Sequence, residues 1–238
     1  NSHTGRLKAG QTERFMESFR TYLMKKTLAL IGACLLADFV ATDRMVVQAG
    51  IALEWTHLSS TTGSLPVPGE STQQTGAIVA DLDKNGVNDF VLCFRKVAPG
   101  LVWYRRGDNG WTRYVIEKEY LTIEAGGASH DIDGDGDMDL VFGGDWQSSD
   151  VWWWENPRPN FDPQTSWKRR LVKTGGARQH HDQVFGDFKG TGKAQLAFWN
   201  QGAKTLFLAD IPDDPKSTQP WLRTSIFTGS AGEGAGKG

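Results

Sequence analysis

Alternating acidic residues in the segment 131–139, which reads DIDGDGDMD, are the strongest chemical signal in the chain. Carboxylates placed this close repel one another unless a cation lies among them. The intervening glycines Gly134 and Gly136 let the backbone turn tightly enough to direct the oxygens inward. Loop positions 1, 3, 5, 7 and 9 are Asp131, Asp133, Asp135, Asp137 and Asp139.

This arrangement predicts calcium as the cation. Ca²⁺ takes about six to eight oxygen ligands, whereas Mg²⁺ needs a smaller and stricter octahedron. The loop contains no Cys or His that would suit zinc. We expect Asp137 to contribute its backbone carbonyl and the other four aspartates their carboxylates. An EF-hand is excluded, because its loop needs Glu at position 12, where this sequence has Phe142 between strand-like flanks.

Two further segments repeat the loop. The segment 81–89, DLDKNGVND, predicts a second calcium site with the ligands Asp81, Asp83, Asn85, Asp89 and the carbonyl of Val87. The segment 187–195, DFKGTGKAQ, places Lys189 at position 3 and Gln195 at position 9. We expect the Lys189 ammonium to replace the metal there, so the sequence predicts two structural Ca²⁺ ions.

The loops belong to a longer internal repeat. Each loop is followed by an apolar strand, an aromatic strand and a last strand that begins near a tryptophan; these tryptophans are Trp111, Trp167 and Trp221, and Trp55 lies one period earlier. Units of four strands and about 50 residues are typical of β-propeller blades. The sequence therefore predicts an all-β fold, a β-propeller of four-stranded blades, with these tryptophans in structural roles.

The repeat boundaries predict the domain organisation. We expect an N-terminal closing strand over 53–58, blades over about 72–120, 121–176 and 177–229, and the start of another blade over 230–238. Propellers have about four to eight blades. We therefore interpret 50–238 as an incomplete N-terminal part, about three to four blades, of a longer propeller.

The N-terminal region predicts export. Residues 24–49 combine a basic start, a short apolar run and small residues before a cleavage site, which is typical of a signal peptide. Lipoprotein anchoring at Cys34 is the weaker alternative, and residues 1–23 have no assigned role. We expect a secreted, periplasmic or cell-surface protein without a membrane span, in which Cys93 is a buried thiol.

Composition excludes some partners. The net charge is −2 and the basic residues form no stripe, so nucleic acid is not an expected partner. The chain has no phosphate-binding or dinucleotide-binding motif. We expect a carbohydrate or protein ligand, and the sequence does not indicate an oligomeric state.

The repeated pattern of aspartates and glycines before an apolar strand resembles the FG-GAP/VCBS repeat, from about Leu53 to the end. That family forms seven-bladed propellers, including the head of integrin alpha subunits. The resemblance implies structural Ca²⁺ at the residues named above, and the third loop departs from its pattern. It does not define a function, because one fold serves many activities.

Polar residues at the predicted starts of the innermost strands are candidates for chemistry. Gln74, Glu124 and His180 occupy equivalent positions in the three repeats, and His181 and Asp182 follow His180. His130 directly precedes the second loop. Histidines and a glutamate from adjacent blades can bind a metal or act as acid and base on a sugar. Lining of a wet channel is the alternative, and alternation lets at most one of two adjacent histidines face a channel.

The run VWWWEN, 151–156, raises a similar choice. Exposed indoles stack on sugars, so Trp152 and Trp154, which share a face, are candidate ligand residues. Aromatic residues at the same place in the other repeats favour packing between blades instead.

These features leave three functions open. The first is a secreted, calcium-stabilised binding or scaffold module, with carbohydrate as the expected ligand. The second is a carbohydrate-active enzyme whose candidate catalytic residues are Glu124, His130, His180 and His181, because the sequence also resembles sugar-active propellers such as aldos-2-ulose dehydratases and some polysaccharide lyases. The third is a cell-surface adhesion protein.

Overall fold

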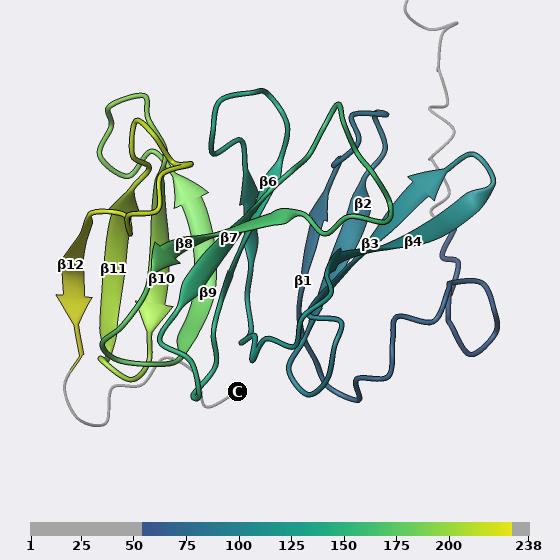
Figure 1. The fold of residues 1–238 in the computed structure, drawn as a ribbon, viewed down its shortest axis with the longest axis horizontal. Helices are drawn as coiled ribbons and strands as arrows, with labels where there is room; N and C mark the ends of the chain where they lie inside the picture. Colours follow the sequence, from purple (N-terminus) through teal and green to yellow (C-terminus); the bar gives the residue numbers. More distant parts are fainter. Residues whose placement is uncertain (1–53, 230–238) are drawn as a thin grey trace, which may run out of the picture. The chain divides into compact units, whose positions relative to one another are not determined.

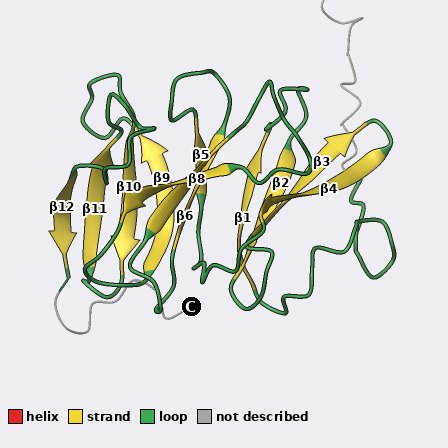
Figure 2. Cartoon of the chain, viewed as in Figure 1, coloured by secondary structure: helices red, strands yellow, loops and turns green. Residues whose placement is uncertain are grey.

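A computed structural model describes residues 54–229, which contain three four-stranded antiparallel sheets and no helix (Figure 2). All three sheets lie in a compact unit that begins at His57. None of the described residues forms a helix of the length and apolarity needed to cross a membrane.

Each sheet is a simple meander, in which the strands pair in chain order (Figure 1). The first sheet contains β1 (Gln74–Ala80), β2 (Asp89–Phe94), β3 (Leu101–Gly107) and β4 (Gly110–Glu117). The second contains β5 (Ala128–His130), β6 (Asp139–Gly143), β7 (Val151–Glu155) and β8 (Lys168–Lys173). The third contains β9 (His180–Gly186), β10 (Gln195–Asn200), β11 (Thr205–Asp210) and β12 (Arg223–Thr228).

The repeat explains this regularity. In each sheet a loop that begins with an aspartate joins the first two strands. The second strands β2, β6 and β10 are short and mostly apolar; β6 and β10 are buried at every position, and β2 is partly buried only at Phe90 and Leu92. Such runs are typical of central strands covered on both sides. The three sheets coincide with the three predicted blades, and the loops fall where the sequence places them.

The sheets pack side by side through their faces. The innermost strands β1, β5 and β9 contact one another in sequence order. One apolar cluster lies between the first and second sheets and contains Trp103, Trp154 and Trp167, and another lies between the second and third sheets and contains Trp153, Phe198 and Trp221. The middle sheet is therefore buried on both faces.

The tryptophan run in β7 belongs to this packing. Trp152 and Trp154 lie in the cluster toward the first sheet, and Trp153 lies in the cluster toward the third. Trp153 and Trp154 have no exposed surface, and Trp152 is 7% exposed. The prediction of Trp154 as a ligand residue is wrong, because its indole faces neighbouring side chains and its Nε1 donates a hydrogen bond to Glu117 at 3.2 Å.

Near the start of the inner strands, glycines let the backbone of one sheet lie directly against the next sheet. A Cβ on Gly76 would lie 2.3 Å from the carbonyl oxygen of Gly126, and one on Gly126 would lie 2.8 Å from the Cα of Asp182. A Cβ on Gly143 would lie 2.6 Å from that of His180. These separations are far below van der Waals contact, so only glycine fits at these positions.

The N-terminal part of the repeat differs from its prediction. Residues 54–58 form no strand, and Trp55 is 91% exposed. A strand here would need a sheet edge to pair with, and the described sheets are complete without it. The other predicted tryptophans pack as expected: Trp167 and Trp221 are buried, and Trp111 lies against Phe90 with ring centroids 5.0 Å apart. The predicted signal peptide, Cys34, residues 1–23 and the segment 230–238 lie outside the described residues.

Candidate functional site

Two loops gather carboxylates in the way that the sequence predicts. Carboxylate oxygens of Asp81, Asp83 and Asp89 lie within 4.8 Å of one another, and those of Asp131, Asp133 and Asp139 do the same. In both loops the position 1 aspartate accepts the backbone N–H of position 6, at 2.8 Å from Gly86 and 3.0 Å from Gly136. The turn thus holds the carboxylate in place through backbone hydrogen bonds.

The second loop has the stronger electrostatic need for a cation. Asp139 is fully buried, and burial raises the pKa of its carboxyl to about 8, although backbone N–H groups of Ile132 and Asn156 donate to it. Burial and the neighbouring Asp135 and Asp133 raise the pKa of Asp137 to about 6. A bound cation would favour the charged forms of both groups.

Asp137 supplies a further observation in favour of a cation. Its side chain is 5% exposed, and its Oδ1 atom is buried without a hydrogen-bond partner. A buried carboxylate oxygen without a donor is costly, and a metal is one of the few groups that remove the cost. The residues present therefore fit a hard cation with oxygen ligands. The geometry leaves open whether Asp137 offers its carbonyl, as predicted, or its carboxylate.

The first loop is similar but is already partly neutralised. Burial raises the pKa of Asp89, and the guanidinium of Arg105 forms an ion pair with Asp83. Asn85 Oδ1 accepts the backbone N–H of Val87 at 2.8 Å, as Asp135 Oδ1 accepts that of Asp137 at 3.2 Å. The predicted ligand roles of Asn85 and of the Val87 carbonyl stay predictions.

The third loop keeps the turn but has no group of three carboxylates among the described residues. Asp187 accepts backbone N–H groups of Thr191 and Gly192 at 2.9 and 2.7 Å. Lys189 Nζ lies 2.6 and 2.7 Å from the two oxygens of Asp210 on β11. The ammonium thus pairs with a carboxylate on the neighbouring strand, and the expectation that it takes the place of a metal in this loop stays a prediction.

Asn156 joins the two acidic loops. Its buried side-chain Nδ2 donates to the carbonyl of Leu82 in the first loop at 3.0 Å and to that of Met138 in the second at 3.1 Å. Its backbone N–H donates to Asp139 at 2.8 Å. One buried amide therefore bonds to both loops.

A second group of polar residues lies at the opposite end of the sheets, where the inner strands begin. Glu124 is 4% exposed and is the centre of this polar cluster. Its Oε1 pairs with Arg95 of the first sheet, whose Nε lies 3.4 Å from Asp145. Its Oε2 accepts from Gln179 at 3.1 Å and lies 3.8 Å from His181 Nε2, both from the third sheet or its approach. The cluster thus joins all three sheets.

Only part of the predicted catalytic set converges there. His181 approaches Glu124, whereas His180 is fully buried and its Nε2 lies 2.8 Å from Asn200. Burial lowers the pKa of His180 to about 3, so this imidazole stays neutral. His130 stacks on Phe185 with ring centroids 4.8 Å apart beside the second loop. His130 and His180 are therefore poor candidates for joint chemistry with Glu124, because packing directs both rings elsewhere.

The backbone beside the cluster is irregular. The pairing of β9 with β10 shifts in register between Phe198 and Trp199 of β10, and the extra residue on β9 is Asp182, with φ of 45°. Gln179 has φ of 69°. Non-glycine residues in this region carry strain, and bulges are frequent next to functional sites. Of the other predicted ligand residues, Asp182 is exposed beside the cluster, whereas Gln74 is exposed and has no hydrogen bond to it among the described residues.

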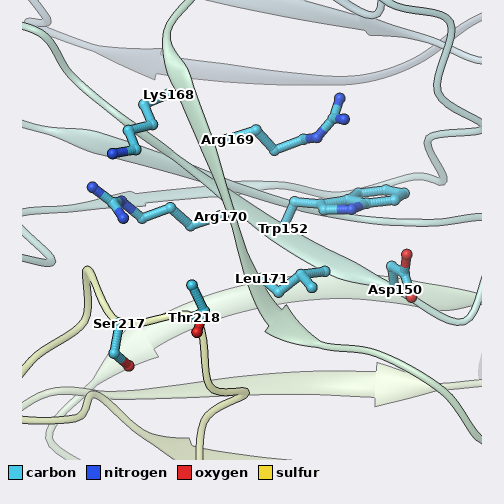
Figure 3. A pocket seen from close by; sticks show the side chains of 8 residues that line it. All are labelled: Asp150, Trp152, Lys168, Arg169, Arg170, Leu171, Ser217 and Thr218. Atoms are coloured by element: carbon cyan, nitrogen blue, oxygen red, sulfur yellow. The ribbon is translucent and has the colours of Figure 1, made fainter.

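A cavity of about 440 Å³ lies at the outer strand β8 (Figure 3). Its lining includes Trp152, Lys168, Arg170 and the segment Ser217–Thr218 of the third sheet. Lys168 and Arg170 extend from one side of the strand, and Trp152 lies on the other (Figure 3). With 7% of its surface exposed, Trp152 offers an edge to this cavity and no open face on which a sugar ring could stack.

Sequence reasoning missed several residues of these sites. Arg95 and Asp145 follow the second strand of two different sheets, so only the three-dimensional arrangement brings them to Glu124. Trp146, which follows Asp145, is 61% exposed and is a better stacking surface than the predicted indoles. The one available signal was its position in the loop GGDWQSSD rather than in a strand. Cys93 is a buried free thiol, as predicted, and burial raises its pKa to about 11.

No protein-family model matches the chain, and no curated protein matches its sequence.

Proposed function

We propose that the described residues form part of a calcium-stabilised β-propeller that serves as a binding or scaffold module. The observation that carries the proposal is the pair of loops in which three carboxylates lie within 4.8 Å of one another, each with a buried aspartate at position 9. Asp81, Asp83 and Asp89 in one loop, and Asp131, Asp133 and Asp139 in the other, hold the ion. Bound calcium neutralises these carboxylates and stabilises the hairpins that join the first two strands.

The arrangement of the sheets supports the propeller. Three similar meanders pack face to face, and their first strands are the neighbours of one another. Repeated four-stranded sheets with adjacent inner strands are the defining arrangement of propeller blades. The resemblance of the acidic loops to FG-GAP/VCBS repeats supports the same assignment, and the N-terminal segment 24–49 supports export.

Carbohydrate is the proposed ligand, and the polar cluster around Glu124 is the proposed binding site. Sugars are bound by aromatic faces together with carboxylate, amide and imidazole groups. Trp146 is exposed beside Asp145, and His181, Gln179 and Glu124 supply the polar groups. These residues come from loops at one end of a rigid scaffold, where binding sites are frequent.

Calcium titration of the full chain, after dialysis against a chelator, tests the metal. We expect two Ca²⁺ ions per chain by isothermal calorimetry and a rise in melting temperature, with Mg²⁺ far less effective at equal concentration. Glycan-array binding by the calcium-loaded protein tests the ligand, with Trp146→Ala as the site variant. Trp55→Ala serves as the matched control, because Trp55 is also exposed. Failure of calcium to bind or to stabilise the chain refutes the proposal.

One observation favours an enzyme as the second candidate. His181 Nε2 lies 3.8 Å from the buried carboxylate of Glu124, and Gln179 Nε2 lies within 3.3 Å of both groups. A histidine beside a buried carboxylate can take a proton from a sugar carbon next to a carbonyl or carboxylate. Incubation with keto-sugars and acidic polysaccharides, followed by mass spectrometry for loss of water or chain cleavage, tests this candidate. Turnover must be lost in His181→Ala and retained in His57→Ala, a variant of an exposed histidine.

A further inference from the structure

A pair of charged residues recurs beside the loop in all three sheets. Each third strand carries a charged residue near loop position 9. In the third sheet Asp210 pairs with Gln195, and in the first and second sheets Arg105 and Glu155 lie one residue beyond the last paired residues Tyr104 and Trp154. Position 3 of the loop carries the residue that this charge can reach. These position 3 residues are Asp83, Asp133 and Lys189.

The first and third sheets contain the same pair with opposite signs. Asp83 in the loop pairs with Arg105 on β3, and Lys189 in the loop pairs with Asp210 on β11 at 2.6 Å. In both sheets the charges balance within the sheet. The third loop, with its own cation, has therefore no electrostatic need for a metal, whereas the first loop shares Asp83 between Arg105 and any bound ion.

The second sheet is different, because both members of the pair are acidic. Asp133 and Glu155 are bridged by Lys216, which lies 2.7 Å from Asp133 Oδ2 and 2.9 Å from Glu155 Oε1. Lys216 does not belong to this sheet but to the segment between β11 and β12 of the third sheet. Arg170 Nη1 donates to its backbone carbonyl at 2.6 Å, which holds the segment against β8.

The side chains of Asp133 and Lys216 differ in their access to solvent. The carboxylate of Asp133 is 2% exposed, whereas the ammonium-bearing side chain of Lys216 is 42% exposed. Lys216 can therefore leave Asp133 for solvent while Glu155, which Arg170 also pairs with, keeps a partner. Lysine is a point charge on a flexible stem, so such a displacement needs no change of the backbone.

We propose that Lys216 is a built-in counter-cation that competes with calcium for Asp133 and sets the calcium affinity of the second loop. Arg105 competes with calcium for Asp83 in the first loop in the same way. The inference rests on the proposed calcium function and adds the residues that tune it. Because Lys216 belongs to the third sheet, calcium in the second loop weakens one contact of the segment between β11 and β12. By linkage, that contact weakens calcium binding to the same extent.

The test is a calorimetric calcium titration of four full-length proteins at low ionic strength. Lys216→Met removes the competing charge and keeps the apolar stem. Lys193→Met makes the same change of net charge in the third loop, at a side chain that is 82% exposed and lies 3.9 Å from Asp213. Arg105→Gln is the corresponding variant of the first loop. We expect Lys216→Met to bind one of its two calcium ions about three- to tenfold more tightly than wild type, and Lys193→Met to stay within about twofold.

A second readout follows the segment itself. In wild type, calcium should increase hydrogen exchange at 212–219 while it decreases exchange in the loop 131–139, because the ammonium is released from Asp133. Lys216→Met should lose the first effect and keep the second. Two calcium ions bound by wild type with unchanged or weaker binding in Lys216→Met overturn this inference alone. A wild-type chain that binds no calcium overturns the proposed function as well.

Discussion

Replacing Asp137 by asparagine separates the two ways in which this residue can serve the second loop. The side chain is buried, its Oδ1 has no hydrogen-bond partner, and its pKa is raised to about 6 by burial and by Asp135 and Asp133. An ordinary aspartate has a pKa near 3.8. Without metal, the folded state therefore binds more protons than the unfolded state between about pH 4 and pH 6, so stability falls as the pH rises through that window.

The magnitude follows from the size of the shift. A difference of about two pKa units corresponds to about 3 kcal/mol above pH 6, and solvent screening of this partly buried group reduces the contribution to about 1–3 kcal/mol. The asparagine side chain carries no charge, so Asp137→Asn should stabilise the metal-free protein by this amount. For a domain of this size the melting temperature should rise by about 2–10 °C. The gain should disappear below about pH 4, where Asp137 is protonated in both states.

The assay is thermal unfolding with a chelator and with calcium, at pH 7.5 and at pH 4. If Asp137 supplies only its carbonyl, Asp137→Asn still binds calcium, weakened about tenfold by the lost charge. Asp131→Asn, which removes a carboxylate ligand, should weaken the same site by about a hundredfold or more. Loss of the second calcium ion altogether in Asp137→Asn would instead assign the carboxylate of Asp137 to the metal. A variant Asp137→Asn that is less stable than wild type in the chelator would refute this reasoning.

Three further outcomes are expected. Asp187→Asn should leave the calcium stoichiometry at two, because the third loop has its own cation; equilibrium dialysis that shows fewer bound ions contradicts this. Burial lowers the pKa of His180 to about 3, so the free energy of unfolding should fall by up to about 1.4 kcal/mol for each pH unit below pH 6.5. His180→Gln should flatten this slope in urea titrations, and an equally steep slope excludes His180 as its origin. Trp153→Ala should cost about 3–5 kcal/mol, whereas Trp146→Ala should stay within about 0.5 kcal/mol; similar costs contradict the burial difference.

The internal sequence repeat was enough to predict most of the fold. Spacing of the loops and of Trp111, Trp167 and Trp221 placed three four-stranded sheets correctly, because each sheet is built from consecutive strands and needs no long-range pairing. Local spacing also located the acidic loops, since all their carboxylates come from nine consecutive residues. Both successes concern features that a short stretch of chain determines by itself.

The contacts between sheets were not predictable in this way. Glu124 was identified from its register, but its partners Arg95 and His181 lie 29 and 57 residues away in sequence and meet it only through packing. Gln74 and His180 share the register of Glu124 and yet do not join it. Each lies beside an irregularity of its own strand, between Gln74 and Gly76 in β1 and at Asp182 in β9. Lys216 also meets Asp133 only through packing, because it belongs to a segment of another sheet.

The glycines at the start of the inner strands have a mechanical consequence. Backbone meets backbone at Gly76, Gly126 and Gly143, so this end of the sheets can neither be compressed nor be widened without losing contact. At the loop end the sheets are joined instead by the side chains of Asn156 and Lys216. The glycine end therefore acts as a pivot, and the sheets can fan apart only at the loop end. If the second loop binds calcium as proposed, the release of Lys216 from Asp133 should loosen the loop end and leave the glycine end unchanged.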